Sequence, residues 1–180
     1  MLKLIVPGDE LFNETTETFE TVGDVELELE HSLVSLSKWE SKFKKPFLSS
    51  DKKTPEEILA YIETMIISPI YPSDVFARFS QENIQQINDY IESSESATTF
   101  GSMPERKGPG EIITSELIYY WMVAFTIPFE CEYWHLNRLF ALIRICNIKN
   151  SPPKKMSRHE IASRNRELNA IRRAQYNTSG

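Results

Sequence analysis

The sequence predicts an α+β fold that is predominantly α-helical: a small N-terminal antiparallel β-sheet, then a helical bundle, then a basic C-terminal helix. Near the N-terminus apolar residues alternate with acids at a period of two, and from residue 32 onward they recur every three or four residues. The 180 residues, 41% hydrophobic and 26% charged, suffice for one globular core. We therefore expect a single domain over residues 1–150 and a helical or flexible tail over residues 151–180.

The β-rich part is expected to span residues 1–31. Strand signals lie at residues 2–6 and 24–30, and the acid–aliphatic alternation of the second stretch turns one set of aliphatic side chains inward. The Thr-rich stretch 15–22 is a candidate for a further strand, with glycines in the turns on either side. These segments predict a small antiparallel sheet whose inward residues include Val25, Leu27 and Leu29.

The helical body is expected over residues 32–150. One helix follows Ser32 and is ended by Pro46, and a second begins at Thr54, which precedes Pro55 and an acid at the third helical position. After a short turn near residues 72–79, Ser80 should cap a third helix that continues to about Glu92. Residues 93–110 combine Ser, Thr, Gly and Pro without a hydrophobic period, which is typical of a loop.

Two more apolar helices should follow this loop, at residues 111–127 and 130–148, separated by Pro128 and packed as an antiparallel hairpin. The first is apolar on nearly every face, so it is either buried all round or leaves a surface uncovered for a partner. It is shorter than the roughly 20 residues that a membrane span needs. We therefore expect no contact with a membrane.

Charge is divided between the two ends of the chain. Residues 1–30 hold nine acids and one base, whereas residues 149–180 hold eight Lys and Arg residues and two acids. The net charge of −6 argues against a general nucleic-acid coat. The basic tail should be helical up to about Ala174, and either it is solvated or it contacts acids or phosphates.

No motif in the sequence composes a catalytic or metal site. Cys131 and His135 are four residues apart, a spacing that supplies only two metal ligands, and a core cysteine beside a half-buried histidine is the stronger interpretation. Cys131 or Cys146 could act as a nucleophile only with groups from elsewhere in the fold. We expect no catalytic residue, no cofactor and no metal. Both cysteines should stay reduced, and no signal peptide is evident, which favours the cytoplasm.

Aromatic and arginine side chains are the candidates for binding a partner. Aromatic residues at helical spacing most often form a core, but a minority can line a groove for an incoming helix. The candidates are Trp39, Phe43, Phe47, Trp121, Trp134, Arg164, Arg166, Arg172 and Arg173.

Several sequence strings carry a resemblance that covers nearly the whole chain. They are HSLVSLSKWES from residue 31, ATTF from residue 97, IYYWM from residue 118, PFEC from residue 128, WHLNRL from residue 134, CNIKN from residue 146, PPKKMS from residue 152 and SRNR from residue 163. Through these strings the chain resembles a family of tailed-phage and prophage proteins of Gram-positive bacteria. Such proteins are regarded as tail assembly chaperones of long-tailed phages (siphoviruses).

The resemblance implies a protein that binds other proteins in the host cytoplasm without catalysis. Its expected partners are the tape measure protein, whose long helices it would keep soluble, and the major tail protein that forms the tube; it could also self-associate. A structural or connector component of the virion is the alternative. A nucleic-acid-binding regulator that uses the basic tail ranks lower, and an enzyme that uses Cys131 or Cys146 ranks last.

Overall fold

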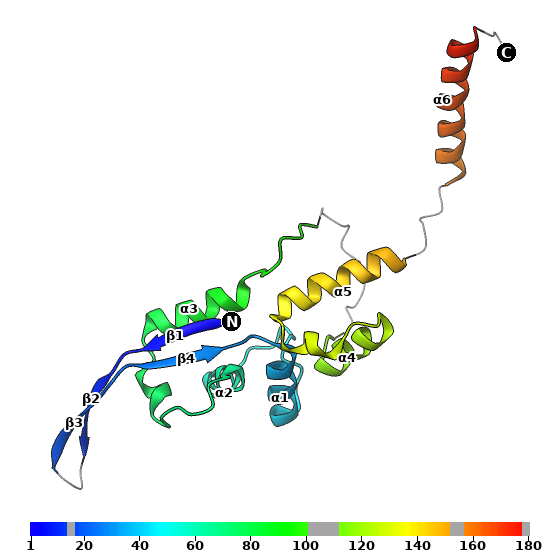
Figure 1. Cartoon of the computed structure of the whole chain (residues 1–180). Helices are drawn as coiled ribbons and strands as arrows, with labels where there is room; N and C mark the ends of the chain where they lie inside the picture. Colours follow the sequence, from blue (N-terminus) through cyan, green and yellow to red (C-terminus); the bar gives the residue numbers. More distant parts are fainter. Residues whose placement is uncertain (14–16, 101–111, 152–156, 178–180) are drawn as a thin grey trace. The chain divides into compact units, whose positions relative to one another are not determined.

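The computed structural model describes residues 1–13, 17–100, 112–151 and 157–177. The chain separates into two compact units, Met1–Asn147 (unit 1) and Ile148–Gly180 (unit 2), each of which is described by itself. Strands occupy the N-terminal part of unit 1 and helices the remainder, which confirms the predicted α+β, predominantly helical class (Figure 1). No described helix is both long enough and apolar enough to cross a membrane.

The N-terminal strands form one antiparallel ribbon in two segments. β1 (Leu2–Val6) pairs with β4 (Val25–Leu29), and β2 (Asp9–Asn13) pairs with β3 (Thr18–Val22). The predicted outer strands are confirmed, and β3 lies inside the Thr-rich stretch. β2 was not predicted, because its sequence Asp-Glu-Leu-Phe-Asn has little strand propensity and it is held by pairing with β3.

The two segments of the ribbon differ in their packing. The inner face of β1–β4 carries Leu4, Val6, Leu27 and Leu29, all fully buried, and α3 (Gln81–Glu92) packs on β1. β2–β3, which we call the arm, pairs chiefly with itself, and Figure 1 shows it continuing the ribbon past the helices. Only the proximal half of the ribbon therefore belongs to the core.

The two sides of the ribbon approach each other closely between its two segments, at Gly8 and at residues 22–24, which we call the neck. A Cβ added to Gly8 would stand 2.2 Å from the carbonyl oxygen of Val22, so no larger residue fits without a backbone shift. The Gly8 N–H donates to Asp24 Oδ1 at 2.8 Å. Buried Arg78 donates from Nη1 to the carbonyl oxygens of Pro7 and Gly23, 3.3 Å each. The neck is thus held by side chains that bind backbone from both strands.

The first two helices begin at the predicted caps. In α1 (Leu33–Phe43) Ser32 accepts a hydrogen bond from the Ser35 N–H, and the helix ends at Lys44 in a left-handed conformation, two residues before Pro46. In α2 (Pro55–Met65) Thr54 and Glu57 form a reciprocal capping box. Both starts are confirmed because the hydrogen bonds that fix them are local.

The chain after α2 extends the β1–β4 sheet on the free edge of β4. The Glu30 N–H donates to the Met65 carbonyl at 2.9 Å, and the Ile67 N–H donates to the Glu28 carbonyl at 2.8 Å. The short 3₁₀ helix η1 (Val75–Arg78) and then α3 follow, with α3 capped by Ser80 as predicted. This edge pairing joins the sheet to the helical layer.

The apolar region after residue 111 differs from its prediction. α4 is shorter (Ser115–Ala124), η2 (Phe129–Tyr133) is a 3₁₀ turn, and α5 (Leu136–Asn150) starts only after it. The expected continuous helix over 130–148 is therefore wrong. The Leu136 N–H donates to the His31 carbonyl at 2.7 Å, so a contact with the start of α1 decides where α5 begins.

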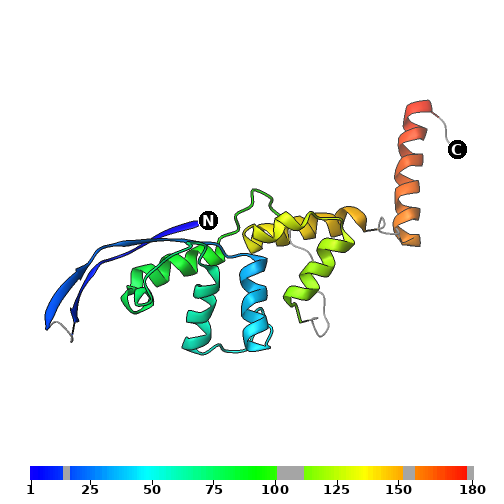
Figure 2. The ribbon, with the colours of Figure 1, turned by 60° about the horizontal axis from the view of Figure 1, so that its bottom comes forward.

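The expected antiparallel pairing of the two apolar helices is also wrong. Within the described part of the chain α4 packs mainly on α1 and has no more than marginal contact with α5. In Figure 2 the two helices run at an angle to each other and not side by side. α5 is tied to the end of α3 by Asn137, whose side-chain amide donates to the carbonyls of Ile91 at 2.9 Å and Ser93 at 2.8 Å.

The predicted loop over residues 93–110 is described only in part. Residues 93–100 contain no helix or strand, and residues 101–111 lie outside the described residues. In unit 2, α6 (Arg158–Tyr176) is the predicted basic helix, with a Ser157–Glu160 capping box at its start and left-handed Asn177 at its end. None of its residues is buried.

Candidate protein-binding surfaces

The first group of predicted binding residues forms a packed aromatic cluster. The Trp39 ring centroid lies 4.8 Å from that of Phe43 and 5.0 Å from that of Phe47, and Phe47 stacks on Tyr61 at 3.8 Å. Trp39 is 1% exposed, and its indole N–H donates to the Glu57 carbonyl at 2.7 Å. Because this burial leaves Trp39 no surface for a partner, its role is to hold α1 against α2. Phe43 and Phe47 are half-buried around it.

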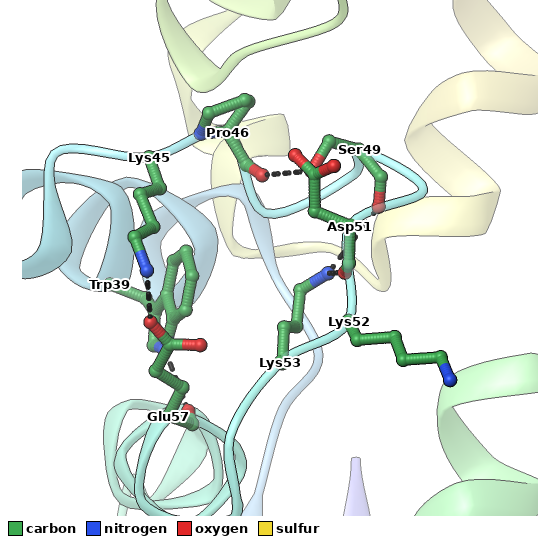
Figure 3. A pocket seen from close by; sticks show the side chains of 8 residues that line it. All are labelled: Trp39, Lys45, Pro46, Ser49, Asp51, Lys52, Lys53 and Glu57. Atoms are coloured by element: carbon green, nitrogen blue, oxygen red, sulfur yellow. Dashed lines mark hydrogen bonds and ion pairs between the residues drawn. The ribbon is translucent and has the colours of Figure 1, made fainter.

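A cavity of about 250 Å³ opens beside this cluster, where the loop between α1 and α2 passes over the indole (Figure 3). Lys45 Nζ lies 2.7 Å from Glu57 Oε1, a contact that, together with the Thr54 N–H, lowers the pKa of Glu57. Lys53 Nζ stands 4.9 Å above the Phe47 ring. Both lysines already contact groups of the protein itself. The residues around the cavity therefore serve mainly to stabilise the loop between α1 and α2.

The second group lies on α4 and η2, which present exposed apolar side chains. On α4 one face is buried in the core through Ile118 and Met122, both 0% exposed. The other side, together with η2, leaves large apolar side chains in solvent, an unusual amount for two short elements. These are Tyr120 (64% exposed), Val123 (63%), Phe129 (55%) and Tyr133 (64%), which we call the α4–η2 surface.

Contacts of Tyr119 hold η2 beside α4. Its hydroxyl donates to Glu132 Oε2 at 2.8 Å, and its ring lies 6.3 Å from that of Phe129. Burial and this carboxylate raise the pKa of Tyr119, so the hydroxyl stays a donor. The predicted residues Trp121 and Trp134 are both half-buried at the edges of this region. Trp134 is covered by Arg138, whose guanidinium carbon lies 4.1 Å from the ring centroid.

A hollow of about 270 Å³ extends from Tyr133 across α1 to the end of α2. Val34 and Lys38 of α1 line it, and Ile67, which is 52% exposed, forms its far wall. Its exposed lining is mostly apolar. The hollow therefore continues the α4–η2 surface into a depression of the kind that receives an apolar side chain.

A buried polar junction that the sequence did not predict lies where β4, α1, α2, α3 and α5 meet. His31 Nδ1 and the Tyr61 hydroxyl are 2.6 Å apart, and the His31 and His135 rings are 5.1 Å apart. His135 Nε2 lies 2.9 Å from the Tyr90 carbonyl, and the Tyr90 hydroxyl donates to Glu30 Oε1 at 2.5 Å. Desolvation, with the charge of His135, lowers the pKa of His31 to about 4.

The Cys131–His135 pair is not part of a metal cluster in the described residues. No group of three or more His, Cys, Asp or Glu side chains able to hold a metal occurs among them. Cys131 is 5% exposed, and burial, assisted by the charge of Glu130, raises the pKa of its thiol. A raised pKa disfavours the thiolate that nucleophilic chemistry requires.

The third group of predicted residues lies on α6. Helical spacing of 100° per residue places four arginines within an arc of about 120°, and the two acids, Glu160 and Glu167, on the opposite side. Between them runs a short apolar stripe of Ile161, Leu168 and Ile171, all exposed. The arginines of this basic face are Arg158, Arg166, Arg172 and Arg173, whereas Arg164 falls within the arc of the apolar stripe.

Comparisons with known proteins returned no relative. No protein-family model, no curated protein and no solved structure matches the chain.

Proposed function

We propose that the chain is a non-enzymatic tail assembly chaperone that binds the tape measure protein during phage tail morphogenesis in the host cytoplasm. The observation that carries the proposal is the α4–η2 surface, where four large apolar side chains are at least half exposed. The resemblance of the sequence to phage tail assembly chaperones supports the same assignment. No nucleotide or cofactor is needed for binding of this kind.

The geometry suits an amphipathic helix as the ligand. Tyr120 and Val123 lie three residues apart on one helix, so they can flank an incoming helix, while Tyr133 and the adjacent hollow can accept a protruding aliphatic side chain. Tyrosines bury apolar area and keep a hydrogen-bonding group, which favours binding to many similar helices over one exact sequence. A chaperone of a long helical protein needs this tolerance.

A structural component of the virion is the second candidate. The same exposed apolar surface would then be covered permanently by a neighbouring subunit, and the chain would remain in finished particles in a copy number set by tail or neck symmetry. The location of the chain separates the two proposals, since a chaperone leaves the assembled tail.

The test is co-expression of the chain with the tape measure protein of the same phage, followed by pull-down and a measurement of soluble tape measure protein. We expect a soluble complex, and at least about a tenfold loss of recovered tape measure protein with the double variant Tyr120→Ser, Val123→Ser. The matched control is Ile58→Ser, Leu59→Ser, two exposed apolar residues of α2 away from the proposed surface. Insoluble, unbound tape measure protein, with the chain present in purified particles, would favour the virion component.

A further inference from the structure

Ion pairs join α1 and the residues just after it to α2. Lys45 Nζ lies 2.7 Å from Glu57 Oε1, and Lys42 Nζ lies 3.6 Å from Glu63 Oε2. The number of the acid rises as that of the lysine falls, so the two helices run antiparallel, side by side (Figure 2). The next lysine in this row is Lys38, one helical turn before Lys42.

Lys38 has no acid of α2 opposite it. Four residues beyond Glu63 the chain carries Ile67 instead of an acid, and Lys38 and Ile67 both line the hollow that begins at Tyr133. Lys38 is exposed and forms no ion pair with any acid that the structure describes. The row of ion pairs therefore ends in an unpaired ammonium group at the rim of a mostly apolar depression.

Among the described residues that line the hollow, only Glu30 carries a carboxylate, and it is already engaged. Glu30 Oε2 lies 3.0 Å from the ammonium group of Met1, and Glu30 Oε1 accepts a hydrogen bond from the Tyr90 hydroxyl at 2.5 Å. The Glu30 side chain is 13% exposed, so it could not turn to Lys38 without leaving both partners. A partner that places an acid here therefore finds Lys38 unpaired.

We propose that Lys38 makes the α4–η2 surface selective for amphipathic helices that carry an acid one helical turn from an aliphatic residue. The aliphatic side chain enters the hollow between Val34 and Ile67, and the acid pairs with Lys38 at its rim. Side chains three or four residues apart are neighbours on a helix surface, so one helix supplies both groups. This inference rests on the proposed function, because it names the chemistry of the helix that the same surface binds.

The test uses the full chain and two Ala-based helical peptides of about 20 residues. Each has leucines along one face and a polar residue one turn from each leucine, which is Glu in the first peptide and Gln in the second. Fluorescence anisotropy at about 50 mM salt should show the Glu peptide binding about two- to fivefold more tightly, and the ratio should shrink at about 500 mM salt. The net charge of −6 alone would favour the Gln peptide, so bulk charge does not explain such a preference.

Substitutions at the rim and wall of the hollow make the test specific. Lys38→Met keeps the apolar stem and should make the two peptides bind equally, whereas Lys38→Glu should reverse the preference. Lys52→Met changes another exposed lysine of unit 1, which does not line the hollow, and should leave the preference intact. Ile67→Ala should weaken both peptides alike, because it removes apolar wall that both of them contact.

The outcomes separate this inference from the proposed function. Equal binding of the two peptides by the wild type, a preference that survives Lys38→Met, or unchanged binding by Ile67→Ala would contradict the inference alone. Failure of both peptides to bind would contradict the inference and the helix-binding surface together. If the preference depends on Lys38 but the tape measure protein is not bound on co-expression, the selectivity stands and the tape measure protein is the wrong ligand.

Discussion

Unit 1 and helix α6 reach stable structure by opposite means. In unit 1, strands and helices that are far apart in sequence bury a common core, in which Leu4 of β1, Leu33 of α1 and Leu136 of α5 are each 0% exposed. In α6 no residue is buried, and the helix is defined by its own capping box and by its C-terminal left-handed residue. The core side chains of unit 1 are therefore buried by packing within the fold, whereas those of α6 remain available to a partner.

The polar junction of unit 1 sharpens this contrast. It places His31, His135 and Tyr61 in the interior and half-buries Tyr90, with hydrogen bonds that join α2, α3 and β4 to the start of α5. Such groups stabilise the fold only while they keep their partners and their neutral state. Unit 1 should therefore respond strongly to substitutions in its interior and to pH, whereas α6 should respond to substitutions of its capping residues.

The largest effect is expected from Trp39→Ala. This change removes the centre of the aromatic cluster and the hydrogen bond to the Glu57 carbonyl, and leaves a large cavity between α1 and α2. We expect the free energy of unfolding of unit 1 to fall by about 3–5 kcal/mol. Urea denaturation followed by Trp fluorescence and circular dichroism measures it.

The control for this change is Tyr120→Ala, which truncates an aromatic side chain that is 64% exposed. It should alter the free energy of unfolding by less than about 0.5 kcal/mol. A similar loss for both variants would mean that α4 is covered in solution, and would remove the main support for the α4–η2 surface as a binding site.

The second effect is a loss of stability in acid through His31. Its pKa is lowered from 6.5 to about 4 in the fold, so the unfolded chain binds more protons between these values. The stabilisation from neutral His31 is complete above pH 6.5 and is lost as the pH falls toward 4. Between pH 7 and pH 5 we expect this histidine to account for about 2 kcal/mol of lost unfolding free energy.

His31→Gln tests that contribution, because the variant lacks the titrating imidazole of His31. The variant is expected to be less stable at pH 7, but its stability should decline less between pH 7 and pH 5 than that of the wild type. Equal pH slopes for the two proteins would show that His31 titrates normally and that the junction is hydrated.

Local signals made the helix starts predictable from the sequence. The caps at Thr54 and Ser80 bind backbone groups three residues away, so the sequence contains the whole interaction. The break at Trp134 and His135 could not be predicted in this way, because it is set by the bridge of His135 to Ser32 and by the hydrogen bond from Leu136 to His31. Such contacts span about a hundred residues of sequence.

The same limit applies to the binding residues. Helical spacing identified Trp39, Phe43 and Phe47 as one apolar group, but not that α2 and the following loop would cover it. The exposed residues Tyr120 and Tyr133 were missed as candidates, although the all-round apolar character of the α4 segment indicated either full burial or an uncovered surface. The periodicity of apolar residues identifies the apolar face of a helix. Whether that face is buried or exposed is decided by packing against elements that are distant in the sequence.

The smallest effect tests the independence of α6. In Ser157→Ala the Glu160 N–H loses its acceptor at 3.2 Å, which should cost the helix about 1 kcal/mol. Because α6 has no buried residue to compensate, its helical fraction should fall, visible as a smaller circular dichroism signal at 222 nm, while the urea midpoint of unit 1 stays the same. Ser179→Ala, beyond the end of α6, is the matched control and should change neither signal. A shift of the urea midpoint of unit 1 with Ser157→Ala would show that the two units are energetically coupled. The stability of α6 would then depend on unit 1 as well as on its own caps.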